Sequence, residues 1–463
     1  MSSLFDLESV VNSSVDYIDE ARGPLSKEEL SNERKAVISM APNTKKSFLR
    51  SISFLSRIVP SLNRVNLSFE KGVNPNELSS PTKPVIYVAN HASNLDSLLI
   101  GTQLFRNDLP FPIFAAGNNL FKSNSVKTLL NYGGAFELER SFPDDNGAYV
   151  TRLNSFLKAS LNANTPILFF PEGTRSRKGS INTFQKGLLS MILDIYLSNL
   201  TQNQTIDDLT FVPLGITYTA VGEEASFLED KNSRAVKSNI FKDFLKLSFG
   251  LKPVYLHVGT PVSAKEYILS RKKQLKVLRR VLASDYVPKI DASNEFFTVG
   301  KHKFSQIRRV LKSIKGKTEP AHLQDLVNLF EYHVPSQKHR KYFISDVFAD
   351  DMLINLRETV PVLEDHVRDY VIVEIMKKKK HYAVPLRKWS KRVDQIMNSL
   401  DDFGYKIISS ETSKETYLNS LKENDEIYRT YNQIHVRESA RFEFYGSRIT
   451  TLLKLKGKPG IKN

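Results

Sequence analysis

Two short segments of this chain hold side chains of the kinds that move protons and bind anions. The first is His91-Ala-Ser-Asn-Leu-Asp96, which directly follows the apolar run Val85–Ala89. Histidine suits general-base work near neutral pH. An aspartate about one helical turn further on can hold the ring in one tautomer. α/β sheets bind ligands at such strand ends. The alternative is structural: Ser93 or Asn94 caps a following helix and His91 merely lies in the turn.

The second segment is Phe170-Pro-Glu-Gly-Thr-Arg-Ser-Arg177, which follows another apolar run, Ile167–Phe170. Pro171 and Gly173 favour a tight, non-helical loop. The guanidinium groups of Arg175 and Arg177 match phosphate oxygens in bidentate geometry. A basic surface loop is the alternative. We expect the remaining residues to support the loop, with Glu172 accepting hydrogen bonds from loop amides or holding one arginine, beside Gly173 and Thr174.

The elements around these segments predict an α/β domain with a mixed, mostly parallel sheet flanked by helices. Apolar runs alternate with helical stretches between about residues 80 and 290, which is typical of such layers. The predicted strands are Pro84–Ala89, Pro112–Ala116, Ala135–Glu139, Pro166–Phe170, Leu209–Tyr218 and Val254–Val258. The predicted helices are Ser97–Phe105, Ser125–Leu130, Ala148–Ala163 and Lys186–Leu197.

Two further regions flank this domain. Residues 1–79 are expected to form a flexible arm or small helical cap, followed by an amphipathic helix over Lys45–Val59. Residues 291–463 are expected to be basic and mainly helical, with helices at Ser305–Ile314, Ala321–His333, Val360–Met376 and Lys388–Leu400.

The amino-acid composition excludes several kinds of site and favours one kind of partner. The 463 residues include no cysteine, which excludes disulfides, thiolate metal sites and a cysteine nucleophile. The nine histidines show no metal-ligand spacing, so we expect no metal site. A formal net charge of +16 favours an anionic partner. Because no nucleic-acid-binding motif is visible, we expect no nucleic acid among the partners.

The membrane relationship is expected to be peripheral. The sequence offers no apolar run of about 20 residues and no signal-peptide pattern, which favours the cytoplasm or the cytoplasmic face of a membrane. Lys45–Val59 and Asn239–Leu247 each oppose apolar and basic residues, as interfacial helices do. Packing of Lys45–Val59 on its own domain remains the alternative. The run Lys377–Lys380 is expected to be a solvated helix face.

Two weaker pieces lie between and beyond the main segments. Gly133-Gly-Ala-Phe-Glu-Leu-Glu-Arg140 ends with an arginine that could add a third cationic contact. Phe211-Val-Pro-Leu-Gly-Ile-Thr-Tyr218 indicates a buried strand, which either belongs to the core alone or lines an acyl tunnel.

In this order the four pieces resemble the four blocks of the glycerolipid acyltransferase superfamily: Asn90-His91-x4-Asp96, Gly133-x2-Phe136-x3-Arg140, Phe170-Pro-Glu-Gly-Thr-Arg175 and Val212-Pro-Leu-Gly215. Within it, segments such as Phe114–Leu120 and Lys186–Met191 are similar to those of glycerol-3-phosphate acyltransferases. The resemblance implies that His91 is the base and Asp96 its orienter. It also implies that Arg140, Arg175 and Arg177 bind the phosphate of the acceptor.

The resemblance therefore implies transfer of a fatty acyl group from a thioester to the sn-1 hydroxyl of glycerol 3-phosphate. The donor is acyl-CoA or acyl carrier protein, used as a co-substrate, and no bound cofactor is expected. Asn90-His-Ala-Ser93 is closer to the lysophosphatidate acyltransferases, so acylation of lysophosphatidate is the alternative. A non-catalytic lipid- or nucleic-acid-binding protein on the same scaffold is a third reading.

Overall fold

The computed structural model describes a chain built around one large sheet. The residues it describes are 5–58, 64–78, 83–122, 124–139, 147–176, 179–182, 184–185, 187–199, 206–221, 252–270, 348–349, 351–379, 382–410, 412–424, 426–430, 432–437 and 439–454. Five features predicted from the sequence lie outside them: Arg140, Arg177, and the helices Asn239–Leu247, Ser305–Ile314 and Ala321–His333.

The central sheet is mixed and mostly parallel, as predicted. Its order is β1-β7-β6-β2-β5-β3-β4, with β8 paired to β6. The pairs β6–β7 and β6–β8 are antiparallel, and the other five pairs are parallel. The strands are β1 (Val65–Phe69), β2 (Val85–Ala89), β3 (Ile113–Gly117), β4 (Ala135–Leu138), β5 (Ile167–Phe169), β6 (Thr210–Tyr218), β7 (Val254–Val258) and β8 (Val262–Ser263).

Helices cover both faces of this sheet because its strands are apolar on both sides. In β2, Ile86 and Val88 belong to one hydrophobic cluster, whereas Val85, Tyr87 and Ala89 belong to another. The first cluster includes residues of α6 (Ala148–Asn162) and α7 (Gly187–Asn199). The second includes residues of α4 (Asp96–Arg106) and the short helix η3 (Asn118–Lys122). The remaining elements of this half are η2 (Pro75–Leu78), α5 (Asn124–Tyr132) and α10 (Ala264–Ser270).

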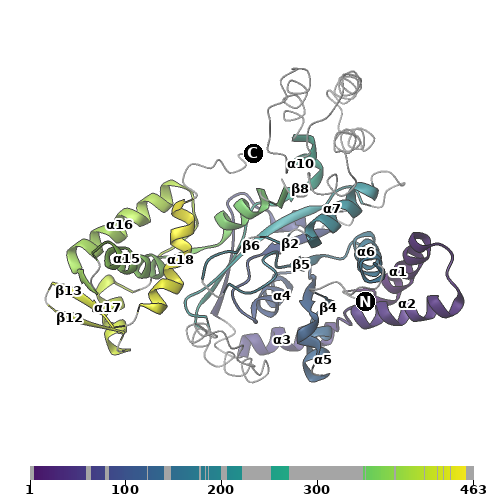
Figure 1. The fold of residues 1–463 in the computed structure, drawn as a ribbon, viewed down its shortest axis with the longest axis horizontal. Helices are drawn as coiled ribbons and strands as arrows, with labels where there is room; N and C mark the ends of the chain where they lie inside the picture. Colours follow the sequence, from purple (N-terminus) through teal and green to yellow (C-terminus); the bar gives the residue numbers. More distant parts are fainter. Residues whose placement is uncertain are drawn as a thin grey trace, which may run out of the picture.

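The N-terminal residues form a helical cap rather than an arm. Helix α1 (Leu7–Arg22) packs against α6 and is followed by α2 (Lys27–Met40), whose first turn has a capping box between Ser26 and Glu29. Glu33 of α2 is nearly buried and accepts from Arg22 (2.7 Å) and from Arg152 of α6 (2.8 Å). These two helices lie at one end of the molecule (Figure 1).

Helix α3 (Lys46–Ile58) forms where amphipathic spacing predicts it, and much of its apolar face packs on its own domain. Leu49 is buried, and the Phe48 ring lies 6.0 Å from that of Tyr132. Phe54 is the exception, with 63% of its surface exposed. Nowhere in the described ranges is a helix both long enough and apolar enough to span a bilayer.

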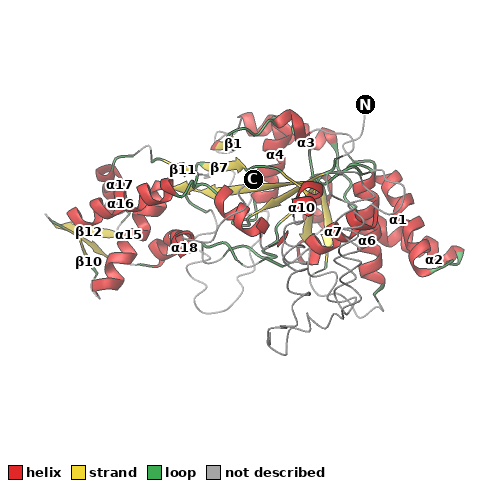
Figure 2. Cartoon of the chain, turned by 90° about the horizontal axis from the view of Figure 1, so that it is seen from above, coloured by secondary structure: helices red, strands yellow, loops and turns green. Residues whose placement is uncertain are grey.

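Residues 351–454, here called the C-terminal unit, are mainly helical but also contain a small antiparallel sheet of order β10-β13-β12. The unit lies at the end of the molecule opposite α1 and α2 (Figures 1 and 2). After a helical segment at 351–359 come β9 (Val362–Leu363), α15 (Glu364–Lys379), β10 (Ala383–Pro385), α16 (Leu386–Asp402), β11 (Ile407–Ile408), α17 (Lys414–Glu423), β12 (Ile427–Thr430), β13 (Gln433–Val436) and α18 (Ala440–Lys454).

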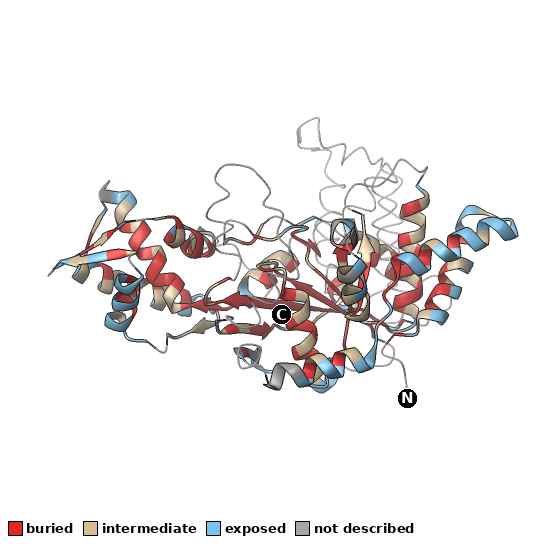
Figure 3. Ribbon diagram, turned by 90° about the horizontal axis from the view of Figure 1, so that it is seen from below, coloured by how far each residue is buried: buried red, intermediate tan, exposed pale blue. Residues whose placement is uncertain are grey.

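The C-terminal unit has its own core around the buried Trp389, and buried residues also run from the unit into the central sheet (Figure 3). Two glycines allow this close approach. A Cβ on Gly215 of β6 would lie 2.4 Å from the Val360 Cα, and one on Gly259 would lie 2.3 Å from the Thr359 Oγ1. No larger residue fits at either position without displacing the backbone or side chain of the unit.

Candidate active site

The carboxyl end of β2 is held in place by an asparagine side chain. Asn90 donates through Nδ2 to the Ile216 carbonyl (3.0 Å) and accepts from the Ile216 N–H through Oδ1 (2.8 Å). These bonds continue the pairing of β2 with β6 by one residue after β2 has ended. The turn that begins at the next residue, His91, is therefore anchored at the carboxyl end of the central strand β2.

His91 and Asp96 meet as their spacing predicts, with Nδ1 2.9 Å from Oδ2. Asp96 is the first residue of α4 and is fully buried. The same Oδ2 accepts from the Ala92 N–H (2.7 Å) and the Ser93 N–H (2.9 Å). A carboxylate so bonded holds the Nδ1–H tautomer, which leaves Nε2 to act as the base. The alternative of a cap at Ser93 or Asn94 does not describe this helix, because its N-cap is Leu95.

Tyr218 is a site residue that the sequence did not reveal as such. Its hydroxyl donates to Asp96 Oδ1 at 2.5 Å from the end of β6. The signal available in the sequence was a tyrosine at the carboxyl end of a buried strand, which reads equally well as core. With this bond, both oxygens of Asp96 have donors, which orients the carboxylate against the histidine.

The Phe170–Ser176 loop lies directly against the His91 turn. Glu172 Oε1 accepts from the His91 N–H (2.8 Å), and its Oε2 accepts from the Asn182 N–H (2.8 Å). The Ser176 N–H donates to the His91 carbonyl (2.7 Å). The Phe170 ring stacks on the imidazole, with centroids 4.3 Å apart. Glu172 therefore takes the first of its two predicted roles: it accepts from backbone amides, one in the His91 turn and one at Asn182.

Burial makes the Glu172 carboxyl group a weaker acid than an ordinary glutamic acid side chain. The residue is 4% exposed, and burial raises its pKa to about 7, with the nearby Asp96 adding to the rise. The two backbone N–H groups and the Arg448 cation act in the opposite direction. This carboxyl group consequently titrates close to neutral pH, which matters for a group that holds two loops together.

A cavity of about 620 Å³ opens beside the histidine, a size typical of pockets for small molecules. His91, Asn94, Gly173 and Thr174 contribute to its wall. Most of the remaining lining is apolar and comes from β3, η3, α5, β4, α6 and α7, for example Phe114, Leu120, Leu130, Leu138, Leu153 and Met191. His91 therefore faces a space suited to a hydrocarbon chain.

Of the three arginines predicted to bind phosphate, only Arg175 is among the residues that the structure describes. Arg175 lies half-buried at the end of the loop, and Gly173 has the positive φ of 67° that the tight turn requires. Arg140 and Arg177 lie outside the described residues. Among the side chains that are described, no group of three or more His, Asp and Glu could hold a metal ion.

Comparison with known proteins places this site in a family context. Residues 72–217 match the Acyltransferase family. The chain is 28% identical to the rabbit (Oryctolagus cuniculus) dihydroxyacetone phosphate acyltransferase over 207 residues, 44% of this chain and 30% of the relative. It is 34% identical to the Pseudomonas putida (strain GB-1) glycerol-3-phosphate acyltransferase over 187 residues, 40% of this chain and 22% of the relative. This chain thus covers less than a third of these relatives' lengths.

One solved structure can be set beside the chain. The 1-acyl-sn-glycerophosphate (LPA) acyltransferase PlsC from Thermotoga maritima aligns with a TM-score of 0.29 at 14% identity, over 66% of this chain and 90% of that one.

Proposed function

We propose, from the match of residues 72–217 to the Acyltransferase family, that the protein transfers a fatty acyl group from an acyl thioester to the sn-1 hydroxyl of glycerol 3-phosphate. The product would be lysophosphatidate, in the first step of phospholipid synthesis. The observation that carries the proposal is His91, paired with the buried Asp96, at the wall of the 620 Å³ apolar cavity.

In this reaction His91 Nε2 takes the hydroxyl proton while the hydroxyl oxygen attacks the thioester carbonyl. Asp96 stabilises the imidazolium that forms, and no proton needs to move onto the carboxylate. As the carbon–sulfur bond breaks, the imidazolium returns the proton to the leaving thiolate. With no cysteine in the chain, we propose direct transfer without a covalent acyl-enzyme.

The acceptor is proposed from the cationic loop and the relatives. Arg175 follows the turn at Gly173 and is assigned to the acceptor phosphate, together with Arg140 and Arg177. The relatives carry the names of glycerol-3-phosphate and dihydroxyacetone phosphate acyltransferases, which supports a small phosphate ester. Lysophosphatidate is the alternative acceptor, because the first block reads Asn90-His-Ala-Ser93.

We also propose that the protein works at the cytoplasmic face of an anionic membrane, attached peripherally. The net charge of +16 supports attraction to anionic lipid. Helix α3 presents exposed Lys46 and Arg50 together with the exposed Phe54, a combination suited to a lipid interface. The product's acyl chain would partition into the same surface.

The decisive assay uses the purified full chain with glycerol 3-phosphate, dihydroxyacetone phosphate and lysophosphatidate, each with acyl-CoA and with acyl carrier protein. We expect the highest kcat/KM with glycerol 3-phosphate, and loss of that activity in the His91→Ala variant. Preference for lysophosphatidate would instead establish the alternative acceptor. Failure to acylate any of the three, by a folded protein, would favour the non-catalytic reading.

A further inference from the structure

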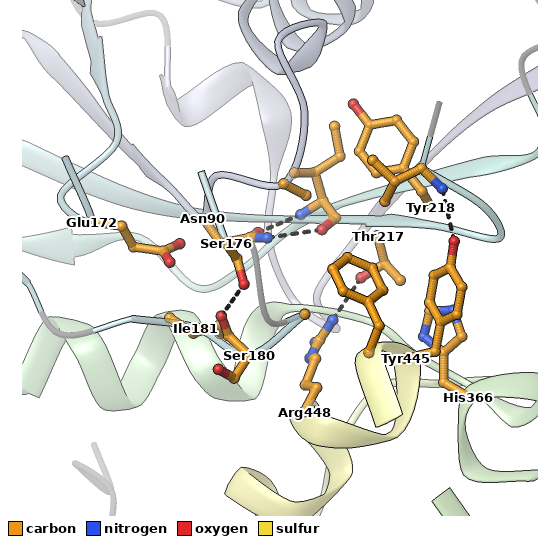
Figure 4. A pocket seen from close by; sticks show the side chains of 15 residues that line it. Asn90, Glu172, Ser176, Ser180, Ile181, Thr217, Tyr218, His366, Tyr445 and Arg448 are labelled. Atoms are coloured by element: carbon orange, nitrogen blue, oxygen red, sulfur yellow. Dashed lines mark hydrogen bonds between the residues drawn. The ribbon is translucent and has the colours of Figure 1, made fainter. Parts of the chain in front are cut away.

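Behind the Phe170–Ser176 loop, on the side of the C-terminal unit, lies a second, much smaller cavity of about 50 Å³. Glu172, Ser176 and Thr217 line it from the acyltransferase half, and His366 and Arg448 line it from the C-terminal unit. Figure 4 shows the Glu172 carboxylate and the Arg448 guanidinium at this cavity. The unit therefore places a cation on the same cavity as the carboxylate that holds the His91 turn.

Arg448 is built into this position. It is buried, its Nη1 donates to the Thr217 Oγ1 (2.8 Å), and its Nη2 donates to the Val360 carbonyl. Its Nε has no hydrogen-bond partner among the described residues. A buried guanidinium with an unused donor is costly for stability alone. Arg448 and Glu172 line the same cavity, and the positive charge of Arg448 lowers the pKa of Glu172.

The helix that carries Arg448 is fixed to the acyltransferase half about one turn before Arg448. The Val221 N–H donates to the Tyr445 hydroxyl (3.0 Å), just past the end of β6. A Cβ on Gly179 would lie 2.0 Å from the Phe444 carbonyl oxygen, so the chain after the loop touches the backbone of α18. These contacts hold the guanidinium at a set position relative to the loop.

We propose that Arg448 is a positioning residue of the acyl-transfer site, which acts through Glu172 to hold the His91 turn against the Phe170–Ser176 loop. The inference rests on the proposed function. An ionised Glu172 accepts strongly from both the His91 and the Asn182 N–H groups, whereas a protonated one accepts well through a single oxygen. By favouring the ionised form, Arg448 makes the C-terminal unit part of the machinery that orients the base.

The charges around Glu172 define what a pH measurement would report. Asp96 at the start of α4 raises the pKa of Glu172, and Arg448 of α18 lowers it. Arg357 of the segment 351–359 is attracted to the same carboxylate. His91 itself also titrates during catalysis. The test must therefore separate a change at Glu172 from a change at His91.

Arg448→Met removes the charge and keeps the bulk of the side chain. We expect kcat at pH 7 to fall about five- to tenfold, because the pKa of Glu172 rises further, and to recover by about pH 9. Arg448→Lys should retain most of the activity at pH 7. In a Glu172→Gln background, Arg448→Met should no longer alter the pH profile, while the contribution of His91 remains. A fall by the same factor at every pH would overturn the proposal.

Hydrogen exchange at the His91 and Asn182 amides supplies a readout that needs no substrate. We expect Arg448→Met to exchange these amides several-fold faster than wild type at pH 7. Thr217→Val, which removes one anchor of the guanidinium, should act in the same direction and serves if Arg448→Met does not fold. Arg441→Met is the matched control, since Arg441 lies on the same helix but pairs with Glu426 (3.0 Å). Unchanged exchange in both test variants would overturn the proposal, even if the wild type proved to have no acyltransferase activity.

Discussion

The hydrogen bonds of Asp96 give a sharp expectation for its replacement by asparagine. From spacing alone, Asp96→Asn should be nearly as damaging as His91→Ala, because the amide could turn its NH₂ toward the histidine and lose the tautomer. The structure argues otherwise. The position of Oδ2 faces two backbone donors, Ala92 N–H and Ser93 N–H, which only an oxygen can satisfy.

The new amide would therefore place its carbonyl oxygen at the Oδ2 position and keep the Nδ1–H tautomer. Its NH₂ would then face Tyr218, whose hydroxyl now donates to Oδ1 and can reverse to accept. What is lost is the charge that stabilises the imidazolium, worth roughly 2–3 kcal/mol, or about 30- to 150-fold in kcat. A wrong tautomer would instead cost about 10⁴-fold, as in serine hydrolases.

Steady-state kinetics with glycerol 3-phosphate and acyl-CoA measure the kcat of Asp96→Asn. The kcat of His91→Ala gives the activity that remains without the histidine, for comparison. Adding Tyr218→Phe to Asp96→Asn removes the hydroxyl that would accept from the new amide, so the double variant should lose more than the two single variants together. A loss in Asp96→Asn as large as that in His91→Ala would show that the amide is turned the other way and would refute this reasoning.

Four further expectations follow from the site. Arg175→Ala should raise KM for the phosphate acceptor several-fold and leave KM for the donor unchanged, with partial rescue by lysine; equal effects on both would make Arg175 a support of the loop. The pKa of Glu172 is about 7 in the folded protein, against an ordinary value of 4.5. The folded state therefore favours the protonated carboxyl group, which adds on the order of 3 kcal/mol to the free energy of unfolding below about pH 4.5. This stabilisation is lost as the pH rises through 7. Denaturant unfolding of Glu172→Gln should therefore show a flatter pH dependence from about pH 5 to 8, and an unaltered slope would contradict the assignment. Met191→Trp, at the wall of the 620 Å³ cavity, should shift the preferred acyl donor toward shorter chains, which a donor series from eight to eighteen carbons can test. Sedimentation with anionic liposomes should decrease at high salt and in Phe54→Asp, and binding that ignores both lipid charge and salt would exclude the electrostatic attachment.

The central sheet was readable from the sequence because its strands are short, apolar on both faces and bounded by loop residues. β7 occupies the predicted Val254–Val258, and β2, β3, β4, β5 and β6 agree to within one residue at each end. β1 was missed although Val65–Phe69 alternates apolar and polar residues as strands do, because the segment is only five residues long and its partner β7 lies far away in the chain. The small sheet of the C-terminal unit was missed because its strands are three or four residues long and lie between charged helices.

The residues of the candidate site also differ in how far the sequence alone could predict them. His91, Asp96 and Glu172 were identified from residue type, spacing and adjacent strands, all local properties. Tyr218 and Arg448 reach the site from positions separated in sequence by 122 residues from Asp96 and 231 residues from Thr217, respectively. No local pattern distinguishes a tyrosine or arginine that will meet such a partner from one that will not.

The glycine contact between β6 and the C-terminal unit has a consequence for how the protein is made. Val360, which lies against Gly215, follows it by about 145 residues in the chain. At ribosomal rates of about 5–20 residues per second, the strands of the central sheet up to β6 are synthesised roughly 7–30 s before the residues that pack on Gly215. During that interval the growing chain presents an uncovered side of β6, a surface of the kind that chaperones recognise, and the cavity lined by Glu172 and Arg448 is still incomplete.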